Sequence, residues 1–441
     1  MDTSQIKNWY LDLFKDFEKH LNGEKSSPVH KVRRNAIETF ADLDFPNLHQ
    51  EDWRFTDISP ILKHTFSRAR REGSRLPAAD QLSPFLFGGM PEHRIVFVDG
   101  FYSPELSSVL ELPKGTVVGS LANALKQEND TAVENISRSL NPGASAFTAL
   151  NTAFAQDGAF IHLPKNAVVE QPVHILFLVT SKDNLIVQPR NLVITGANSR
   201  VNIVEHYASL TDTVYFTNTI TEYIVGENSN IDVANIQSEH ESAYHVASTV
   251  ATLAAGANFV SHGVLLGASI YRHDVNVILT GEGGSTNLEG LYLTRGEQLS
   301  DTHTMIDHAA PRCTSQEHFK GILDGKSRGV FNGKILVRKG AQQTNSYQEN
   351  RNIILSNEAK VDTKPQLEIF ADDVKCSHGA TVGQLSEESL FYLRARGIGV
   401  EQARLMLIYA FANDVLKGIK EDEVRSELAG ILSSRFLENV S

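Results

Sequence analysis

The chain has 441 residues, and its 41 Lys and Arg against 53 Asp and Glu give a formal net charge of −12 at pH 7. This acidic balance argues against general binding to nucleic acids or to an anionic membrane surface. The two cysteines, Cys313 and Cys376, do not support a disulfide framework, and no secretory signal is visible. Apolar runs such as 175–179 are too short to span a bilayer. We therefore expect a cytoplasmic protein.

The first part of the chain shows mainly helical spacing. Residues 3–21 place apolar side chains three and four positions apart with Lys and Asp between them, which predicts an amphipathic helix. Pro28 is expected to break this pattern, and a second helix is predicted over about 30–43. Helical spacing returns over 120–155. These patterns predict an N-terminal, mainly helical domain over 1–155.

From residue 160 the pattern changes to short β-branched runs that are separated by Gly, Asn and Asp. Runs such as 174–179 and 219–225 are typical of strands. One template recurs, in which Gly and a polar stretch with Ser precede Asn or Asp beside an apolar residue. It occupies 196–202, 226–232 and 281–287, and 356–362 is expected to be a degenerate fourth copy.

The spacing of this template favours one β architecture over another. Its Asn or Asp positions, Asn202, Asp232 and Asn287, are 30 and 55 residues apart, and 255–258 marks a further turn inside the longer gap. Steps of roughly 25–30 residues are expected for successive coils of a β-solenoid. A β-sandwich would need hairpin turns every 8–12 residues or so, and hairpin dipeptides are scarce here. We predict a mainly β protein with a solenoid core over 156–384.

Helical patterns return in a C-terminal region over 385–441. Ser386 is a predicted N-cap, and helices are expected over 386–397, 400–417 and 421–437. The middle helix carries an apolar stripe, which we expect to pack against the end of the solenoid. The stripe consists of Val400, Ala403, Leu407, Phe411 and Val415.

Segment 321–327 invites comparison with a phosphate-binding loop. Its first Gly is one residue too close to the Gly–Lys pair, and the residues that follow have a strand pattern. A phosphate cradle needs a helix N-terminus aimed at the anion. We therefore expect no nucleotide site in this chain, so that any use of ATP belongs to a partner.

A second candidate is a run of His303, His308, Cys313 and His318 at five-residue steps. Neither helical nor strand periodicity places all four side chains on one face. No Cys-x-x-Cys or His-Glu-x-x-His motif accompanies them. A β surface rich in His is favoured over a bound zinc ion.

Cys376 and His378 lie two residues apart, just before the β pattern ends. Positions i and i+2 of a strand face the same side, and two rises put these groups roughly 6–7 Å apart along the chain. That distance is wide for clamping one ion and suits two groups presented to a larger object or to another subunit. A half-buried Cys and a surface His at a strand end is the structural alternative.

Long motifs also carry a family resemblance. Asp-Asp-Val-Lys-Cys-Ser-His-Gly-Ala-Thr-Val-Gly at 372–383, followed by Leu-Phe-Tyr-Leu-Arg-Ala-Arg-Gly at 390–397, resembles the signature of the SufB/SufD family. These proteins are scaffold subunits for iron–sulfur cluster assembly. Segments 319–322, 325–333 and 51–57 resemble the same family, so the likeness covers most of the chain. It implies a right-handed parallel β-helix flanked by N-terminal and C-terminal helical domains, and a scaffold that is not an enzyme.

The resemblance further implies a site and its partners. In the family, a His at the position of His378 is implicated in forming the nascent cluster where two scaffold subunits meet. Imidazole and thiolate both suit iron, so we expect His378 as a metal ligand and Cys376 as a second cluster-binding residue. The implied partners are a SufB-like subunit through the β-helix and a SufC-like ABC-type ATPase through the C-terminal helices. The chain alone is expected to form a homodimer and to hold no cluster stably.

One departure places the chain within the family. The SufB type carries a sulfur-accepting Cys upstream of the signature, and the corresponding stretch here, 345–352, has none. The chain therefore resembles the SufD branch, and acceptance of sulfur by this chain is not expected. Two alternatives remain at this stage. They are a β-helix enzyme that acts on polysaccharide and a cytosolic metalloenzyme that uses His303, His308 and His318.

Overall fold

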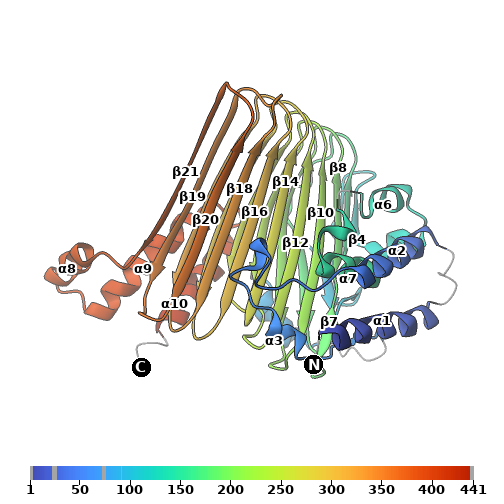
Figure 1. The fold of residues 1–441 in the computed structure, drawn as a ribbon, viewed down its shortest axis with the longest axis horizontal. Coiled ribbons are helices and arrows are strands. Elements are labelled where there is room, and N and C mark those ends of the chain that lie inside the picture. Colours follow the sequence, from blue (N-terminus) through green and yellow to red (C-terminus); the bar gives the residue numbers. More distant parts are fainter. Residues whose placement is uncertain (1–2, 22–26, 72–75, 91, 139, 438–441) are drawn as a thin grey trace.

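The computed structural model describes residues 3–21, 27–71, 76–90, 92–138 and 140–437. Its centre is a parallel β-solenoid, with helices at both ends of the chain (Figure 1). The described part is 39% strand and 26% helix, and the solenoid makes about eight turns. The predicted fold class, a mainly β chain with a solenoid core, is thus confirmed.

The strands alternate between two sheets, so each pass of the chain adds one strand to each sheet. The described strands form sheets of eleven and ten members. The first, sheet A, contains β1 (Ser67–Arg68), β4 (Val117–Ser120), β5 (Ala159–Leu163), β7 (Leu185–Val187), β8 (Arg190–Thr195), β10 (Phe216–Val225), β12 (Tyr244–Leu253), β14 (Ile270–Leu279), β16 (Leu299–His308), β18 (Arg328–Val337) and β20 (Lys360–Ile369).

Sheet B faces sheet A across the lumen of the solenoid. It contains β2 (His93–Val98), β3 (Phe101–Tyr102), β6 (Val173–Val179), β9 (Arg200–Ser209), β11 (Asn230–Gln237), β13 (Asn258–Leu265), β15 (Ser285–Thr294), β17 (Thr314–Leu323), β19 (Thr344–Ile354) and β21 (Val374–Gly383). All neighbouring pairs in the described sheets are parallel except β2 with β3 and β4 with β5. Parallel pairing follows because each strand is one coil away from its neighbour.

Apolar side chains fill much of the lumen, and their alternation along each strand explains why these segments form sheets. Ile203, Val233, Phe259, Val277 and Ile306 are each at most 2% exposed and belong to one continuous core. Successive residues of a strand face opposite sides, so one half of each strand lines this core. The other half faces outward, where the helical segments cover part of it.

The recurring template corresponds to stacked turns, as predicted. Asn202 pairs in register with Asp232, and Asn287 follows two coils later through Val260. Residues 255–258 do mark the intermediate turn, because β13 begins at Asn258. The fourth copy is a correction. Segment 356–362 leads into β20 of sheet A, whereas the other copies lead into strands of sheet B.

Asn side chains stack along these turns. Asn166, Asn198 and Asn228 all have positive φ, which Asn tolerates better than most residues. The amide of Asn198 donates to Asn166 at 3.0 Å, and that of Asn228 donates to Asn198 at 3.3 Å. The ladder gives a local reason for the polar, Asn-rich template, because each coil satisfies the turn amides of the next.

The N-terminal segments pack on the outer face of sheet A. Helices α1 (Thr3–Lys19), α2 (Pro28–Asp42) and α7 (Ala146–Phe154) share an apolar core with residues such as Phe216 and Ile270 on the strands. Pro28 does not simply break a helix. It is the first residue of α2, where its missing N–H costs nothing, and Ser27 caps that helix. The predicted N-terminal domain over 1–155 contains β1 to β4, which belong to the two sheets of the solenoid.

Short helices complete this half of the molecule. They all precede β5 in the chain. They are η2 (Glu51–Trp53), α3 (Ser59–Leu62), α4 (Ala79–Leu82), η4 (Ser83–Phe85), α5 (Leu121–Lys126), α6 (Asp130–Asn135) and η5 (Pro142–Ala144).

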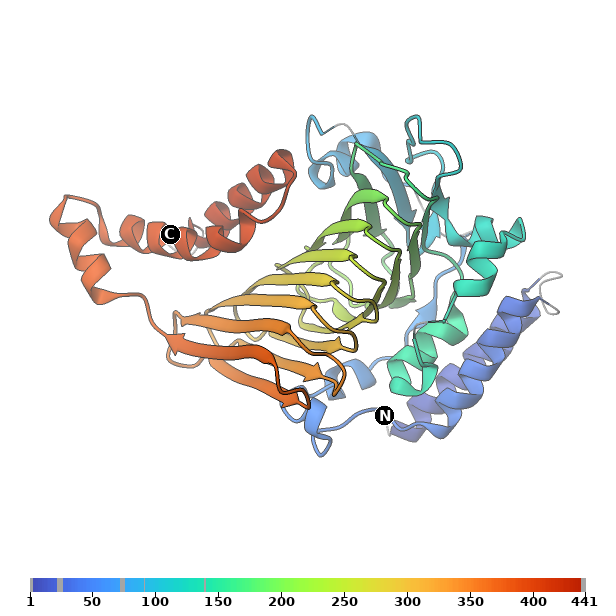
Figure 2. The same ribbon diagram turned by 90° about the horizontal axis from the view of Figure 1, so that it is seen from above.

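The C-terminal helices are α8 (Glu387–Ala395), α9 (Val400–Leu416) and α10 (Asp422–Leu437). Ser386 caps α8 as predicted. Helices α9 and α10 share a core with Val264, Leu291 and Ile322 of sheet B, so they lie along the side of the solenoid (Figure 2). The prediction that they pack against its end is wrong. No helix in the described ranges is long and apolar enough to cross a membrane.

The predicted stripe of α9 is also partly wrong. Ala403 and Val415 are buried, Leu407 and Phe411 are half-buried, and Val400 is exposed. The buried face is completed by Ile408, Ala412 and Leu416. The helix packs on a sheet on one side and on α10 on another, so its buried face is wider than a single stripe.

Candidate functional site

The last strand of sheet B, β21, carries Cys376 and His378. In the parallel register Cys376 lies beside Ser346 and His378 lies beside Gln348 of β19. Ser346 and Gln348 are buried in the lumen, so Cys376 and His378 are on the inward side of the sheet. The two side chains therefore share one face of the last strand, at the open end of the lumen.

Cys376 is half-buried and packs on an apolar cluster that includes Ile335, Val337, Ala341 and Ala371. Burial raises the pKa of its thiol. The group is therefore a protonated thiol at neutral pH, and a bound metal ion would have to displace that proton. Packing as a small apolar residue accounts for its present contacts.

His378 is exposed, in contrast to its neighbour on the same face. Throughout the described parts of the chain, no group of three or more His, Cys, Asp or Glu side chains is placed to hold one metal ion. The pair on β21 thus offers two donor atoms of the types that bind iron, an imidazole nitrogen and a thiol sulfur. Two donors are fewer than a cluster or a tetrahedral ion uses.

Exposed apolar side chains on the last two strands and on the turn between them form an apolar rim at the open end. Phe370 is 63% exposed, Val382 47% and Ile369 39%. These side chains are exposed because β20 and β21 end the two sheets and no further coil covers them among the described residues. Ile369 and Val382, which would face the lumen in an inner coil, face solvent here, and an exposed apolar patch is typical of an interaction surface.

The histidine-rich run does not form a site. His303 lies on the outer side of sheet A, 3.0 Å from an Arg272 guanidinium nitrogen, whereas His308 is buried in the lumen and bonds Ser315 at 2.9 Å. Cys313 is buried in a turn, and His318 lies on sheet B with its Nδ1 3.7 Å from a Glu349 carboxylate oxygen. The four side chains point to separate places, so the hypothesis of a metal site built from them is not supported.

Comparison with known proteins identifies the family. The description "SUF system FeS cluster assembly, SufBD core domain" matches residues 177–411, and "SufBD protein N-terminal region" matches 4–175. An iron–sulfur cluster assembly SufBD family protein of Synechocystis is 33% identical over 426 residues, which cover 95% of this chain and 93% of that protein. The chain belongs to the SufBD family.

Proteins named SufD are among its relatives. The iron–sulfur cluster assembly protein SufD of Escherichia coli is 30% identical over 421 residues, covering 94% of both chains. The protein of the same name from Bacillus subtilis is 26% identical over 441 residues, covering 97% of both. The matched core region ends within α9, so the open end and the start of the C-terminal helices both lie inside it.

The SufBD motif at 319–333 has a structural role in this chain. Segment 321–327 covers the end of β17 and the turn that leads to β18, with Gly325 at φ +66°, and a strand follows it, as predicted. Gly333 lies opposite Gln348, and a Cβ at this position would overlap the Gln348 amide. The glycine at position 333 therefore leaves room for the Gln348 side chain inside the lumen.

A second surface of this SufBD chain lies on the C-terminal helices. On α8, Phe391 is 74% exposed and Tyr392 56%. A cavity of about 340 Å³ opens between α9 and α10, lined by residues that include Met406, Tyr409 and Leu432. Helix α8 has no buried side chain, and it projects away from the strands (Figure 2).

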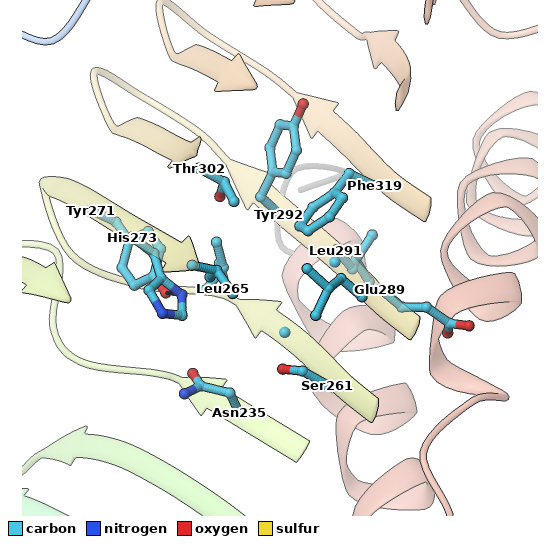
Figure 3. Close-up of a pocket in the computed structure, with 14 residues that line it drawn as sticks. Asn235, Ser261, Leu265, Tyr271, His273, Glu289, Leu291, Tyr292, Thr302 and Phe319 are labelled. Carbon is cyan, nitrogen blue, oxygen red and sulfur yellow. Dashed lines mark hydrogen bonds between the residues drawn. The ribbon is translucent and has the colours of Figure 1, made fainter. Parts of the chain in front are cut away.

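Sequence reasoning missed the polar lining of the lumen. A cavity of about 30 Å³ lies inside the solenoid, where Tyr271, His273, Tyr292 and Phe319 gather, whereas Glu289 points away toward the C-terminal helices (Figure 3). The cavity has room for about one water molecule.

A sequence signal for the polar lining was present in β19. Its inward positions carry polar residues at a period of two, namely Ser346, Gln348, Asn350 and Asn352.

Proposed function

We propose that this chain is a SufD-like scaffold subunit that builds nascent iron–sulfur clusters together with a SufB-like subunit and a SufC-like ATPase. The observation that carries the proposal is the open end of the solenoid, where His378 and Cys376 share one face beside the apolar rim. Family membership and the relatives named SufD support the branch. They also favour cluster assembly over an enzyme that acts on polysaccharide.

The chemistry of the pair fits a shared site. The nascent cluster is the cargo of the scaffold, and an iron–sulfur cluster takes about four protein ligands. This chain offers two donors at its open end, so a SufB-like subunit that covers the apolar rim would supply the others. The thiol of Cys376 would lose its proton on binding. The cluster is accordingly transient and interfacial, and the isolated chain holds none stably.

The remaining partner would dock on the C-terminal helices. Phe391 and Tyr392 are both exposed on α8, and the cavity between α9 and α10 lies on the same helical region. An ABC-type ATPase bound there could transmit its ATP-driven dimerisation through α8 to β21, because the two elements follow each other directly in the chain. Catalysis of ATP hydrolysis belongs to that partner, and this chain is a cytoplasmic scaffold that is not itself an enzyme.

Without its partner, the chain would pair with a second copy through the open end. The same apolar rim would then be covered by its own counterpart, which produces a homodimer. The acidic net charge of −12 speaks against nucleic acid or an anionic membrane as a partner.

The test is the cluster yield of the co-expressed complex with His378→Ala. We expect a yield at least about tenfold lower with normal assembly, because one iron ligand is lost. His240→Ala is the matched control, since His240 is exposed but lies in a turn before β12. An unchanged yield in His378→Ala, with the complex intact, would remove His378 from the mechanism.

A further inference from the structure

The lining of sheet B changes along the solenoid. On β6, near its first coils, the inward side chains are apolar and include Val173, Ile175 and Phe177. On β19, the neighbour of β21 in sheet B, four successive inward side chains are polar, and each is at most 3% exposed: Ser346, Gln348, Asn350 and Asn352. Burying polar groups costs free energy unless they are hydrogen-bonded, so hydrophobic packing does not account for this lining.

One column of this lining leads to His378. Glu317 on β17, Gln348 on β19 and His378 on β21 are successive partners in the register of sheet B. Gln348 Nε2 donates to Glu317 Oε2 at 2.5 Å, and both residues are fully buried. The Gln348 amide is thereby held in one orientation, and Gly333 leaves the space that it occupies.

The column ends in an unused acceptor. Gln348 Oε1 is buried and has no hydrogen-bond partner among the described residues. Neighbouring strands are about 4.8 Å apart, so a side chain on β21 can reach a group on β19. The imidazole of His378 is exposed in the isolated chain, and it is therefore free to rotate toward Gln348 when a second subunit covers the open end.

We propose that Gln348, oriented by Glu317, is the positioning residue for His378, accepting a hydrogen bond from one imidazole N–H so that the other ring nitrogen faces the cluster. The cluster-ligand role of His378 rests on the proposed function. Ligating His residues generally donate their second N–H to an acceptor, which sets the tautomer and the ring orientation. In this chain the buried Gln348 amide oxygen would be that acceptor.

The carboxyl of Glu317 suits this arrangement. Burial raises its pKa to about 7, so it is not a fixed negative charge at neutral pH. The Gln348 amide donates to this carboxyl at 2.5 Å, and the Thr304 hydroxyl also interacts with it. Hydrophobic packing alone does not require a buried carboxyl that holds an amide directly below an exposed ring.

The test uses the full complex, with its cluster reduced and examined by pulsed EPR for the coupling to imidazole nitrogens. The variant Glu317→Leu/Gln348→Leu removes both buried partners together, so it leaves neither one unpaired and is expected to fold. We expect the quadrupole coupling of the remote imidazole nitrogen to shift and the cluster yield to fall by about tenfold. Glu317→Gln keeps an acceptor for Gln348 Nε2 and is expected to preserve the wild-type signal.

Ser315→Ala/Ser346→Ala is the matched control. These two hydroxyl groups lie 2.6 Å apart in the neighbouring column, which leads to Cys376 instead of His378. An unchanged nitrogen coupling in the double Leu variant, or an equal shift in the Ser control, would overturn the proposal. The variant His378→Ala distinguishes the ligand role of His378 from the positioning role of Gln348. If it abolishes the coupling while the double Leu variant leaves it unaltered, His378 is a ligand that Gln348 does not position, and if the coupling persists in His378→Ala, the ligand assignment itself fails.

Discussion

The two ends of the solenoid are built differently. At the first coils, β3 and β4 run antiparallel to their neighbours, and Tyr102, Leu112 and Val118 cover the core. At the last coil, strands β20 and β21 end the sheets without such a cover in the described structure, and Phe370 remains 63% exposed. Natural proteins generally protect open sheet ends, so the uncovered end is the one that a partner is expected to occupy.

We expect the two ends to serve stability and function separately. Near the covered end, a fully buried ion pair joins Arg190 to Glu222, with 2.5 Å between a guanidinium nitrogen and a carboxylate oxygen. Near the open end, the buried polar groups lie in a column below His378 and are only partly satisfied. Changes in the first group should affect folding, and changes in the second should affect the site.

The largest expected effect is on the covered half. Glu222→Ala leaves the Arg190 guanidinium buried without its carboxylate, which should cost about 3–5 kcal/mol of unfolding free energy. Denaturant unfolding measures this loss. Glu170→Ala is the control, because its ion pair with Arg200 is exposed and its removal should change stability by less than about 0.5 kcal/mol. Equal losses in the two variants would contradict the assignment.

The next effect concerns pH and the open half. Burial raises the pKa of Glu317 from 4.5 to about 7 in the folded chain, so the folded state binds this proton more tightly than the unfolded state. Its contribution is therefore fully present below about pH 4.5 and is lost as pH rises through 7, a fall of about 3 kcal/mol.

Glu317→Gln should remove that fall. Unfolding free energies of the wild type and the variant, measured between pH 5 and pH 8, should diverge as pH rises, with the variant more stable at pH 8. Parallel curves would show that the Glu317 carboxyl does not titrate differently in the two states.

The smallest effect tests the apolar rim itself. Phe370→Ser should leave the fold intact, because the side chain is exposed, and weaken pairing by about 2 kcal/mol, roughly thirtyfold in the dissociation constant. Sedimentation of the chain alone and with a SufB-like subunit measures the pairing. Phe391→Ser on α8 is the control, because Phe391 is also exposed, and it should retain pairing and instead lose the ATPase. If Phe370→Ser lost the ATPase and Phe391→Ser lost pairing, the two surfaces would have the opposite partners.

The sequence predicted much of the architecture, for reasons that lie in single residues. Asn202, Asp232 and Asn287 revealed the coil spacing because each coil repeats the same turn. The motif around Cys376 and His378 revealed the family because it is long. The alternation of Gln348 with its neighbours was available as a signal, but period two alone does not say which side of a strand is buried.

Local pattern settles what a coil repeats, namely its turn residues, its strands and the alternation of their side chains, because these depend on neighbours in the chain. It could not settle that 356–362 enters the opposite sheet, that α9 lies along sheet B, or that Glu317 and Gln348 stack below His378. Those facts depend on contacts between residues that are about 30 or more positions apart, and such contacts exist only once the coils have stacked.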